Sequence, residues 1–240
     1  MASGAELRRL MEDICSEIGF RHFALIHHDD LRKDKPGLIN INNYPPVWAD
    51  YFIERRLYIE DPIVHACLRT NAGFSWSNLS DLIRLNGRHR TILEHAGREG
   101  LNEGITIPAC VRGERSGSCS FGGPRDGTAL ERYMMIAQLV GAFGFAAARR
   151  LASGNELVVP QAPRLSPRQR ECVILVGQGK SDWEIATILG LSPITVKHYL
   201  ADARRVYDVP SRTQLVICAI LDNEIGLSEL APWQYVHLVG

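Results

Sequence analysis

The stretch GKSDWEIATILGLSPITVKHYL, residues 179–200, restricts the fold more than any other part of this 240-residue chain. A serine followed three residues later by a glutamate, at Ser181, is typical of a helix start. Gly190 can end that helix, and a serine-proline pair directly afterwards can start another. Two helices joined by a glycine-containing corner form a helix-turn-helix. We therefore predict helices over 182–189 and from 193 to about 207.

The same capping pattern recurs along the C-terminal part of the chain. Each of four expected helices begins at a serine, and three of these serines have a glutamine or glutamate three residues later, as a capping box requires. The serines are Ser166, Ser181, Ser192 and Ser211, and the box partners are Gln169, Glu184 and Gln214. A side-chain cap is typically worth about 1 kcal/mol, so these starts should be sharply placed. We expect an all-α, four-helix domain over residues 165–227.

The helix from 193 to about 207 has one apolar face and one cationic face. The arc that must face the core holds Val196, Leu200, Ala203 and Tyr207. The opposite arc holds Ile194, Lys197, His198, Ala201, Arg204 and Arg205. Lys and Arg bind guanine edges or phosphates, and an apolar side chain can contact a thymine methyl group, so this arc suits a DNA groove. A solvated basic face without nucleic acid is the plainer alternative.

Two helix starts close to this arc also suit DNA. A helix N-terminus attracts phosphate because its first amides lack partners within the helix. We expect backbone contacts from Lys180 and Ser181 at one start, and further contacts from Ser192 and Thr195 at the other.

Residues 165–220 resemble the DNA-binding domain of LuxR-type transcription regulators. The matching positions are Glu171, Gly179, Lys180, Ser181, Glu184, Ile185, Leu189, Gly190, Ser192, Thr195, Val196, His198, Val209 and Arg212, and Ile185 is followed by Ala186 as in the family. The resemblance implies that the helix over 193–207 is the recognition helix. The family often has Asn in place of Ala201 and Lys-Leu in place of Arg205-Val206, which leaves the base sequence that is read open.

Composition narrows the class of protein. Lys plus Arg equals Asp plus Glu at 27 each, so any cationic surface has to be local. The six cysteines are scattered without a metal-ligand spacing, which indicates reduced core residues. No segment has the apolar length of a bilayer span, so we expect a cytoplasmic protein that does not associate with membranes.

The N-terminal part, residues 1–151, alternates helical and β-like segments. Helical periodicity over about 88–98 and over 128–151 flanks two β-like runs that suit a hairpin. The whole order predicts an α+β domain, an α-β-α sandwich in which helices cover both faces of an antiparallel sheet. The segment 152–164 contains Gly, Asn and two prolines and predicts a linker, and residues 228–240 form a tail.

The segment NYPPVWADYFIERRLYIEDPIV, residues 43–64, resembles the signature of the acyl-homoserine-lactone-binding domain of quorum-sensing LuxR regulators. The resemblance covers about residues 20–122 and rests on Asn43-Tyr44-Pro45, Trp48, Asp61-Pro62, Trp76 and Gly104. A phosphorylated receiver domain is the other common sensor in front of such a DNA-binding domain. It needs alternating βα units, which the helical stretch after NYP does not supply, so we reject it.

An acyl-homoserine lactone presents two carbonyl groups, one amide N–H and an apolar chain, so its pocket needs two kinds of polar partner. The resemblance assigns the lactone carbonyl to the Trp48 indole, the amide N–H to Asp61 and the amide carbonyl to Tyr44. Ser120, or Ser118 on the same strand face, is a second donor to the amide carbonyl. The apolar wall is expected from Ala24, Ile26, Phe52, Ile63, Val64 and Trp76. Phe52 and Ile63 replace hydroxylated residues of many relatives, which leaves the acyl preference open.

Each of these residues also has a purely structural explanation. Trp48 and Trp76 are large enough to be core residues, and Asp61 before Pro62 is a helix cap in its own right. The run HHDD at residues 27–30 does not suit a metal site, because neighbouring residues at a strand end point apart. We expect no metal, no catalytic residues and no cofactor beyond the acyl-homoserine lactone as ligand.

The two parts together predict a ligand-responsive transcription regulator that is not an enzyme. A homodimer is expected because two helix-turn-helix units match a twofold-symmetric operator DNA. RNA polymerase is a further candidate partner, and Trp233 and Tyr235 of the tail are candidates for a packing or dimer contact. Three alternatives stay open: an orphan regulator that needs no ligand or senses another molecule, an enzyme targeted to DNA by its C-terminal domain, and an antagonist that dimerises with a related regulator.

Overall fold

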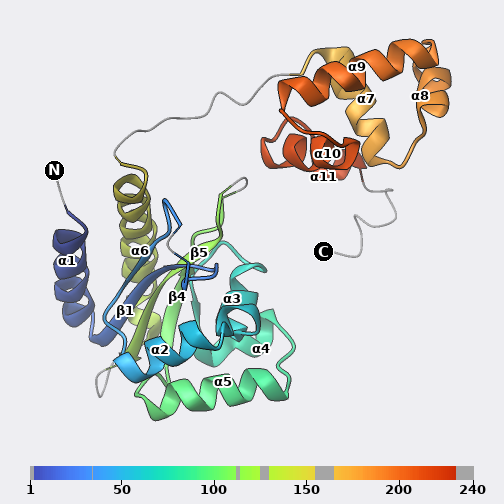
Figure 1. The fold of residues 1–240 in the computed structure, drawn as a ribbon. Coiled ribbons are helices and arrows are strands. Elements are labelled where there is room, and N and C mark those ends of the chain that lie inside the picture. The colour runs from blue at the N-terminus through green and yellow to red at the C-terminus, as the bar shows by residue number, and fades with distance from the viewer. Residues whose placement is uncertain (1–2, 34, 112–113, 125–129, 155–164, 231–240) are drawn as a thin grey trace. The chain divides into compact units, whose positions relative to one another are not determined.

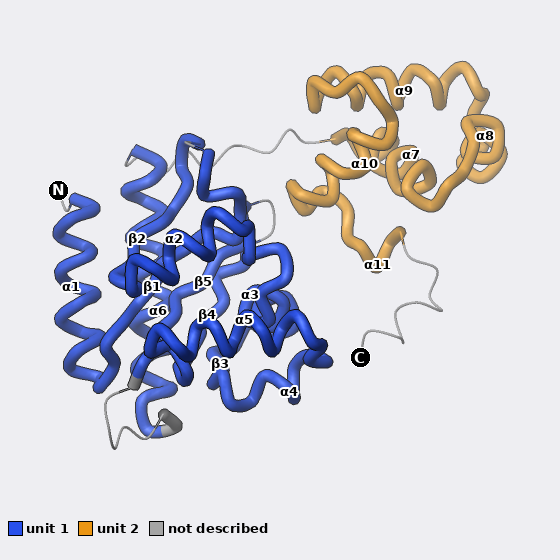
Figure 2. Tube along the Cα trace, turned by 60° about the horizontal axis from the view of Figure 1, so that its bottom comes forward, with its two compact units in different colours: residues 1–158 blue, residues 159–240 orange. Residues whose placement is uncertain are grey.

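The computed structural model describes residues 3–33, 35–111, 114–124, 130–154 and 165–230. The chain forms two compact units, residues 1–158 and 159–240, drawn in two colours in Figure 2. The first unit holds an antiparallel sheet between helical layers, and the described part of the second is helical (Figure 1). The expected fold class is therefore confirmed.

Part of the expected domain organisation lies outside the described residues. This applies to residues 155–164 of the linker and to residues 231–240 of the tail, which include Trp233 and Tyr235. The exact linker and tail boundaries stay predictions. Among the described helices, none combines the length and the apolar character that crossing a bilayer requires.

The described residues of the first unit form a five-stranded sheet in the order β2-β1-β5-β4-β3. The strands are β1 (Phe20–His27), β2 (Asn40–Asn42), β3 (Phe74–Ser75), β4 (Gly104–Pro108) and β5 (Gly117–Pro124). All neighbouring strands are antiparallel. Ala24 pairs with Ser120 and Ile26 with Ser118 between β1 and β5, and Thr106 of β4 pairs with Ser120 from the other side.

One face of the sheet is sealed by α1 (Gly4–Glu17) and α6 (Leu130–Ala152) (Figure 1). The strand residues that point to these helices are large and apolar, because side chains alternate between the two faces of a strand. This core contains Met11, Phe23, Leu25, Ile105, Ile107, Cys119, Phe121 and Phe145. The helix α6 approaches closely at Gly141, where an added Cβ would lie 2.9 Å from Ile107.

The opposite face of the sheet carries small or polar residues at the alternate positions, among them Ala24, Thr106, Ser118 and Ser120. It is covered by α2 (Pro46–Glu54), α3 (Pro62–Cys67), α4 (Leu79–Leu82) and α5 (Gly87–Arg98), with short 3-10 turns at Leu57–Ile59 and Trp76–Asn78. Small side chains on the sheet do not fill the space beneath these helices. This face therefore leaves room for a cavity.

The second unit contains α7 (Pro167–Gly177), α8 (Asp182–Leu189), α9 (Pro193–Val206), α10 (Arg212–Leu221) and the short α11 (Leu227–Leu230). All four expected helix starts are present, and each serine side chain accepts a hydrogen bond from the amide three residues later. Reciprocal capping boxes form at Ser166 and Ser181. The box expected at Ser211 was wrong, because the Ser211 hydroxyl contacts Gln214 Oε1 at 3.0 Å and leaves that side chain turned away from the Ser211 amide.

The turn between α8 and α9 is set by Gly190, which adopts the left-handed backbone conformation with φ 66°. An L-residue with a Cβ rarely adopts this φ, so glycine suits the corner. Val196, Leu200 and Ala203 of α9 are buried against the other helices, as the apolar arc predicts. The opposite arc of α9 is thereby turned away from the core.

Candidate functional site

A cavity lies between the polar face of the sheet and the helices α2, α3 and α5. About 780 Å³ of space between atoms lies within its lining, a figure that includes open solvent at its mouth. All ten ligand-binding residues expected from the sequence line this one cavity: Ala24, Ile26, Tyr44, Trp48, Phe52, Asp61, Ile63, Val64, Trp76 and Ser120. The structure thus brings together side chains that are far apart in the sequence.

Asp61 lies in the cavity wall as the cap of α3. Its Oδ1 accepts a hydrogen bond from the Ile63 amide at 2.9 Å, and no second bond to this carboxyl group occurs among the described residues. The side chain is buried, and burial raises the pKa of Asp61 from 3.8 to about 6; the Ile63 amide and His65 oppose the rise. The expected cap and an acceptor facing the cavity therefore coexist in one residue.

Trp48 offers a hydrogen-bond donor to the same cavity. The residue is only 5% exposed and packs with Tyr51 and Phe52, whose ring centroids lie 6.2 and 6.0 Å from its own. Within the described part of the chain, its Nε1 makes no hydrogen bond. An indole N–H can only donate, so this group suits a carbonyl oxygen of a ligand.

A chain of hydroxyl groups runs through the sheet behind the cavity. Trp76 Nε1 donates to Thr106 Oγ1 at 2.8 Å, and Thr106 Oγ1 lies 2.8 Å from Ser120 Oγ. Tyr44 lines the cavity together with Ser120, and burial raises the pKa of its hydroxyl. Either hydroxyl of the Thr106–Ser120 pair can donate to the other; where Thr106 donates, the Ser120 proton is available to an acceptor in the cavity.

The Trp76 ring occupies the space left by two glycines of the central strands. A Cβ added at Gly104 would lie 2.8 Å from the ring, and one added at Gly122 would lie 2.9 Å from it. The glycine expected from the family resemblance at position 104 therefore has a packing reason. The absence of a side chain at Gly104 gives the indole of Trp76 the space to reach Thr106.

The structure adds cavity residues that the sequence did not single out. These are His28, Leu31, Asn40, Asn42, Ala49, Ile53, Ile92, Leu93, Ala96 and Leu101, together with Ser118, which was expected only as an alternative to Ser120. Two signals could have found some of them. His28 continues the alternation of Ala24 and Ile26, and Ile92 and Ala96 are spaced four residues apart on one helix.

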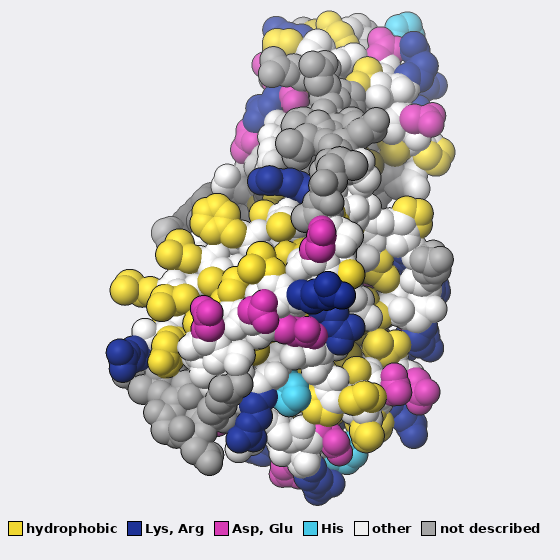
Figure 3. Space-filling model, turned by 90° about the vertical axis from the view of Figure 1, so that its left-hand side faces the viewer, with side chains coloured by type: hydrophobic (Ala, Val, Ile, Leu, Met, Phe, Trp, Pro, Cys, Tyr) yellow, Lys and Arg dark blue, Asp and Glu magenta, His cyan; other side chains and the backbone are white. Residues whose placement is uncertain are grey.

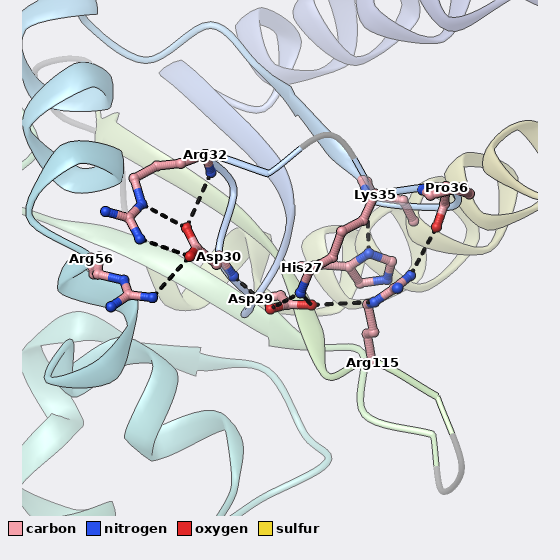
Figure 4. Close-up of polar contacts among 9 residues, drawn as sticks. His27, Asp29, Asp30, Arg32, Lys35, Pro36, Arg56 and Arg115 are labelled. Atoms are coloured by element: carbon pink, nitrogen blue, oxygen red, sulfur yellow. Dashed lines mark hydrogen bonds and ion pairs between the residues drawn. The ribbon is translucent and has the colours of Figure 1, made fainter.

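The loop between β1 and β2 is held at the cavity by ion pairs (Figure 4). Asp30 bonds Arg32 at 2.8 Å and Arg56, at the end of α2, at 2.9 Å; Arg32 first, and then Arg56, hold its pKa well below the usual range. Asp29 pairs with Lys35 at 2.8 Å and with Arg115 at 3.3 Å. These contacts fix the loop whose Leu31 lines the cavity.

The two histidines of the HHDD run point to opposite faces of the sheet. His27 Nδ1 accepts from the Ile39 amide at 3.0 Å, and its ring meets Phe145 of α6 at 5.4 Å. His28 instead lines the cavity. The two rings and the two ion-paired aspartates therefore do not converge on one point.

In the second unit, α9 presents the expected DNA-contacting side chains on the face opposite its core contacts. Ile194 is 69% exposed, and Lys197 and His198 are also exposed. Arg204 donates to the Pro210 carbonyl at 3.0 Å, and Arg205 is ion-paired with Asp202. Lys197 is a cation of this face without an ion pair among the described residues. Ala201 lies half-buried on the same helix.

The two helix starts expected to contact phosphate differ in charge. At α8 the Ser181 hydroxyl and amide both bond to the Glu184 carboxylate, at 2.7 and 2.8 Å, so a negative group already occupies that start. The Lys180 carbonyl there accepts from Arg212 at 2.8 Å. The first turn of α9 carries no acidic residue.

The hydroxyls at the start of α9 are engaged in its cap. Ser192 Oγ accepts from the Thr195 amide at 3.1 Å and lies 2.8 Å from the Thr195 hydroxyl. The unpaired backbone amides of this start are the groups left for an anion. Without a neighbouring carboxylate, α9 has the better phosphate site of the two.

Comparison with protein families identifies both parts of the chain. Residues 3–151 match the family model described as autoinducer binding domain, and residues 163–219 match that of bacterial regulatory proteins of the luxR family. The chain belongs to the LuxR family of regulators. Both resemblances drawn from the sequence are thereby confirmed.

Individual relatives of this LuxR-family chain agree with the assignment. The HTH-type quorum sensing-dependent regulator RpaR of Rhodopseudomonas palustris is 28% identical over 87% of this chain and 84% of its own length. The HTH-type regulator y4qH of Sinorhizobium fredii is 30% identical over 85% of this chain, which spans 61% of y4qH. The crystal structure of Escherichia coli SdiA has the same fold, with a TM-score of 0.59, 20% identity and coverage of 93% of this chain and 92% of SdiA.

Membership of the LuxR family settles the class of activity. The chain is a DNA-binding transcription regulator of the quorum-sensing type and not an enzyme. Its N-terminal unit is a domain for a small-molecule autoinducer. The cavity is the site that this unit offers for such a molecule.

Proposed function

We propose that the autoinducer of this regulator is an N-acyl-homoserine lactone and that it binds in the cavity of the first unit. The observation that carries the proposal is the arrangement of polar groups in an otherwise apolar wall. Trp48 Nε1 is a donor without a partner among the described residues, Asp61 is an acceptor, and Ser120 with Tyr44 supplies further donors. This set complements the lactone carbonyl, the amide N–H and the amide carbonyl in turn.

The apolar rest of the lining provides the space for the acyl chain. Ala24, Ile26, Val64 and Leu93 come from the sheet and from two different helices. A ligand in this space connects layers that otherwise enclose a void. Ligand binding therefore raises the stability of the first unit, since a molecule that binds only the folded state shifts the folding equilibrium.

We propose further that α9 lies in the major groove of an operator. Ile194, Lys197, His198 and Arg205 would face base edges or phosphates, with Arg204 and Ala201 beside them. The start of α9, with Ser192 and Thr195, would contact a phosphate, and Lys180 would approach the DNA backbone from the preceding corner. Contact with RNA polymerase stays a prediction.

We propose that a homodimer forms through the outer surface of α6. Met135, Leu139 and Phe143 are 80%, 60% and 72% exposed and recur at every fourth residue, so they form one apolar stripe. Ile136 and Leu10 of α1 extend it. Figure 3 shows hydrophobic side chains gathered on the side of the molecule where α1 and α6 lie. A stripe of this kind suits the same stripe of a second copy, as a twofold interface requires.

The experiment that tests the ligand is thermal unfolding of the full chain against straight, branched and aromatic N-acyl-homoserine lactones. A ligand at a hundred times its dissociation constant should add about 2.7 kcal/mol of stability and raise the unfolding midpoint by several degrees. Trp48→Phe keeps the aromatic packing but removes the donor to the lactone carbonyl. We expect this variant to lose most of the shift.

Trp183→Phe provides the matched control. Trp183 is 69% exposed on α8, so the same change there should leave the response to ligand intact. A chain that no lactone stabilises would contradict the proposal and favour the orphan regulator. Recovery of unchanged lactone after incubation would confirm binding without turnover.

A further inference from the structure

A second polar pair lies in the cavity wall, apart from the groups assigned to the lactone and the amide. His28 follows the end of β1 and Ser118 belongs to β5, and both line the cavity. His28 Nε2 lies 2.9 Å from Ser118 Oγ. The pair is surrounded by apolar lining residues such as Ile26, Leu31 and Val64.

The pair is displaced along the strands from the expected amide site. Ser118 precedes Ser120 by two residues on the same strand face, which corresponds to roughly 7 Å. Ala24 and Ile26 of β1, and His28 just after its end, likewise lie at alternate positions on the cavity side of the sheet. A ligand whose amide carbonyl is held at Ser120 can therefore extend its acyl group along the sheet to His28.

The hydrogen bonds of the pair leave one position open. The tautomer of His28 decides which of Nε2 and Ser118 Oγ donates, and in both cases Nε2 is satisfied by Ser118. His28 Nδ1 has no hydrogen-bond partner among the described residues and is shielded from solvent.

The unpaired nitrogen needs a partner in either tautomer of the ring. Burial, and then His27, lower the pKa of His28 from 6.5 to about 4, so the imidazole is neutral at neutral pH. If Nε2 donates to Ser118, Nδ1 carries a lone pair, and if Nε2 accepts, Nδ1 carries the proton; a hydroxyl group of a ligand complements both forms because it can donate and accept. A buried polar atom without a partner costs free energy, and a plain alkyl chain beside it does not remove that cost.

We propose that this regulator selects a homoserine lactone whose acyl group carries a hydroxyl group, and that His28 Nδ1 hydrogen-bonds to this hydroxyl. The proposal rests on the function proposed above and adds the chemical class of the acyl group. Ser118 is the positioning residue, because it holds the imidazole ring through Nε2 and so fixes the direction of Nδ1. The remaining wall at this end is apolar, which suits a chain or ring that bears a single polar group.

The test compares matched pairs of ligands on the full chain by isothermal titration calorimetry. Each pair has one acyl skeleton with and without a hydroxyl, placed at successive positions of a straight chain and at the end of a phenyl-bearing chain. We expect the wild type to bind at least one hydroxylated ligand about tenfold more tightly than its deoxy partner, the effect of one buried hydrogen bond. His28→Phe should abolish this preference and bind the deoxy ligand at least as well as the wild type does.

Two further variants separate a direct contact from a structural effect. Ser118→Ala should reduce the preference, because it releases the ring, without abolishing lactone binding. His95→Phe is the control, since His95 packs on Tyr51 at 4.9 Å and does not line the cavity. It should keep the preference of the wild type.

The outcomes distinguish this inference from the proposed function. If both members of every pair bind the wild type equally well, the inference is overturned and the lactone-binding function stands. A hydroxyl preference that persists in His28→Phe overturns it as well. If no lactone of either kind binds, the proposed function fails and this inference fails with it.

Discussion

Trp76 and Thr106 are joined by a 2.8 Å hydrogen bond from the indole Nε1 to the threonine Oγ1, and this bond orients the hydroxyls of the cavity. Thr106 is fully buried and lies between Trp76 and Ser120. It is a positioning residue, because it contacts the expected ligand only through Ser120. Its importance comes from the link that its hydroxyl makes between the Trp76 indole and Ser120.

Replacing Thr106 with valine should therefore weaken ligand binding without changing the shape of the cavity. The change leaves the Trp76 N–H unpaired in the core and removes the acceptor and donor between Trp76 and Ser120. We expect a loss of about 1–3 kcal/mol in the free energy of unfolding and a lower affinity for the lactone. Chemical denaturation and calorimetric titration measure the two effects.

Two controls belong to the Thr106 experiment. Thr106→Ser keeps a hydroxyl at the same Cβ and should retain most of the affinity. Thr91→Val removes a hydroxyl on the exposed side of α5 whose one bond among the described residues is to the Gly87 carbonyl, at 3.1 Å, and should have a small effect. Equal losses in Thr106→Val and Thr106→Ser would show that the hydroxyl chain has no part in binding.

Lactone binding should depend on pH through Asp61. Burial raises the pKa of this carboxyl group from 3.8 to about 6 in the ligand-free protein, and an amide N–H bonds best to the ionised form. The apparent dissociation constant should rise by about tenfold per pH unit below pH 6 and become constant above about pH 7. Titrations between pH 5 and 8 measure it, with Asp61→Asn as the variant that should bind weakly and with little pH dependence.

The same pKa determines the stability of the ligand-free protein. The folded state keeps the Asp61 proton to a higher pH than the unfolded state does, so between pH 4 and 6 it binds more protons. The contribution of Asp61 to stability is therefore complete below about pH 4 and is lost as the pH rises through about 6. The unfolding free energies of the wild type and of Asp61→Asn are compared over this pH interval. If the difference between them instead rises with pH in favour of the wild type, burial does not control the pKa of this carboxyl group.

Much of the second unit and of the cavity could be predicted because short-range patterns determine them. Serine caps and Gly190 act within a few residues, so α7 to α10 begin where the sequence indicates. The cavity residues Tyr44, Trp48 and Asp61 belong to one contiguous signature. The capping box at Ser211 could not be separated from the others by spacing alone, because spacing does not decide whether Gln214 Oε1 meets the Ser211 amide or its hydroxyl.

The residues that were missed depend on long-range register. Thr106 reads as an ordinary strand residue until the pairing of β4 with β5 places it beside Ser120. His28 reads as part of a charged run until the strand ends beside Ser118. The ion pair of Arg56 with Asp30 joins positions that only the folded loop brings together. Periodicity gives the face of a residue but not its neighbour on the next strand.

A charge placed on the apolar stripe of α6 should dissociate the proposed homodimer. Leu139→Glu and Phe143→Glu each introduce a carboxylate into a surface that would be buried twice in a twofold interface. Sedimentation velocity should show a shift from dimer to monomer with unchanged unfolding of the monomer. Leu68→Glu is the matched control, because Leu68 is 64% exposed at the end of α3, on the other side of the sheet. If both α6 variants remain dimers, the dimer interface does not include the apolar stripe of α6.

Lys197→Ala should weaken DNA binding with a measurable change in its salt dependence. Lys197 is exposed on α9 and has no ion pair among the described residues, so its charge is available to DNA. Removing one phosphate contact should lower the slope of log affinity against log salt by about 1. Fluorescence anisotropy on a duplex that the wild type selects from a random pool measures both the affinity and the slope. Arg90→Ala removes the same charge from the exposed surface of α5 and should change neither. If Lys197→Ala behaves like Arg90→Ala, Lys197 does not contact the DNA, and the α9 start at Ser192 becomes the surface to test next.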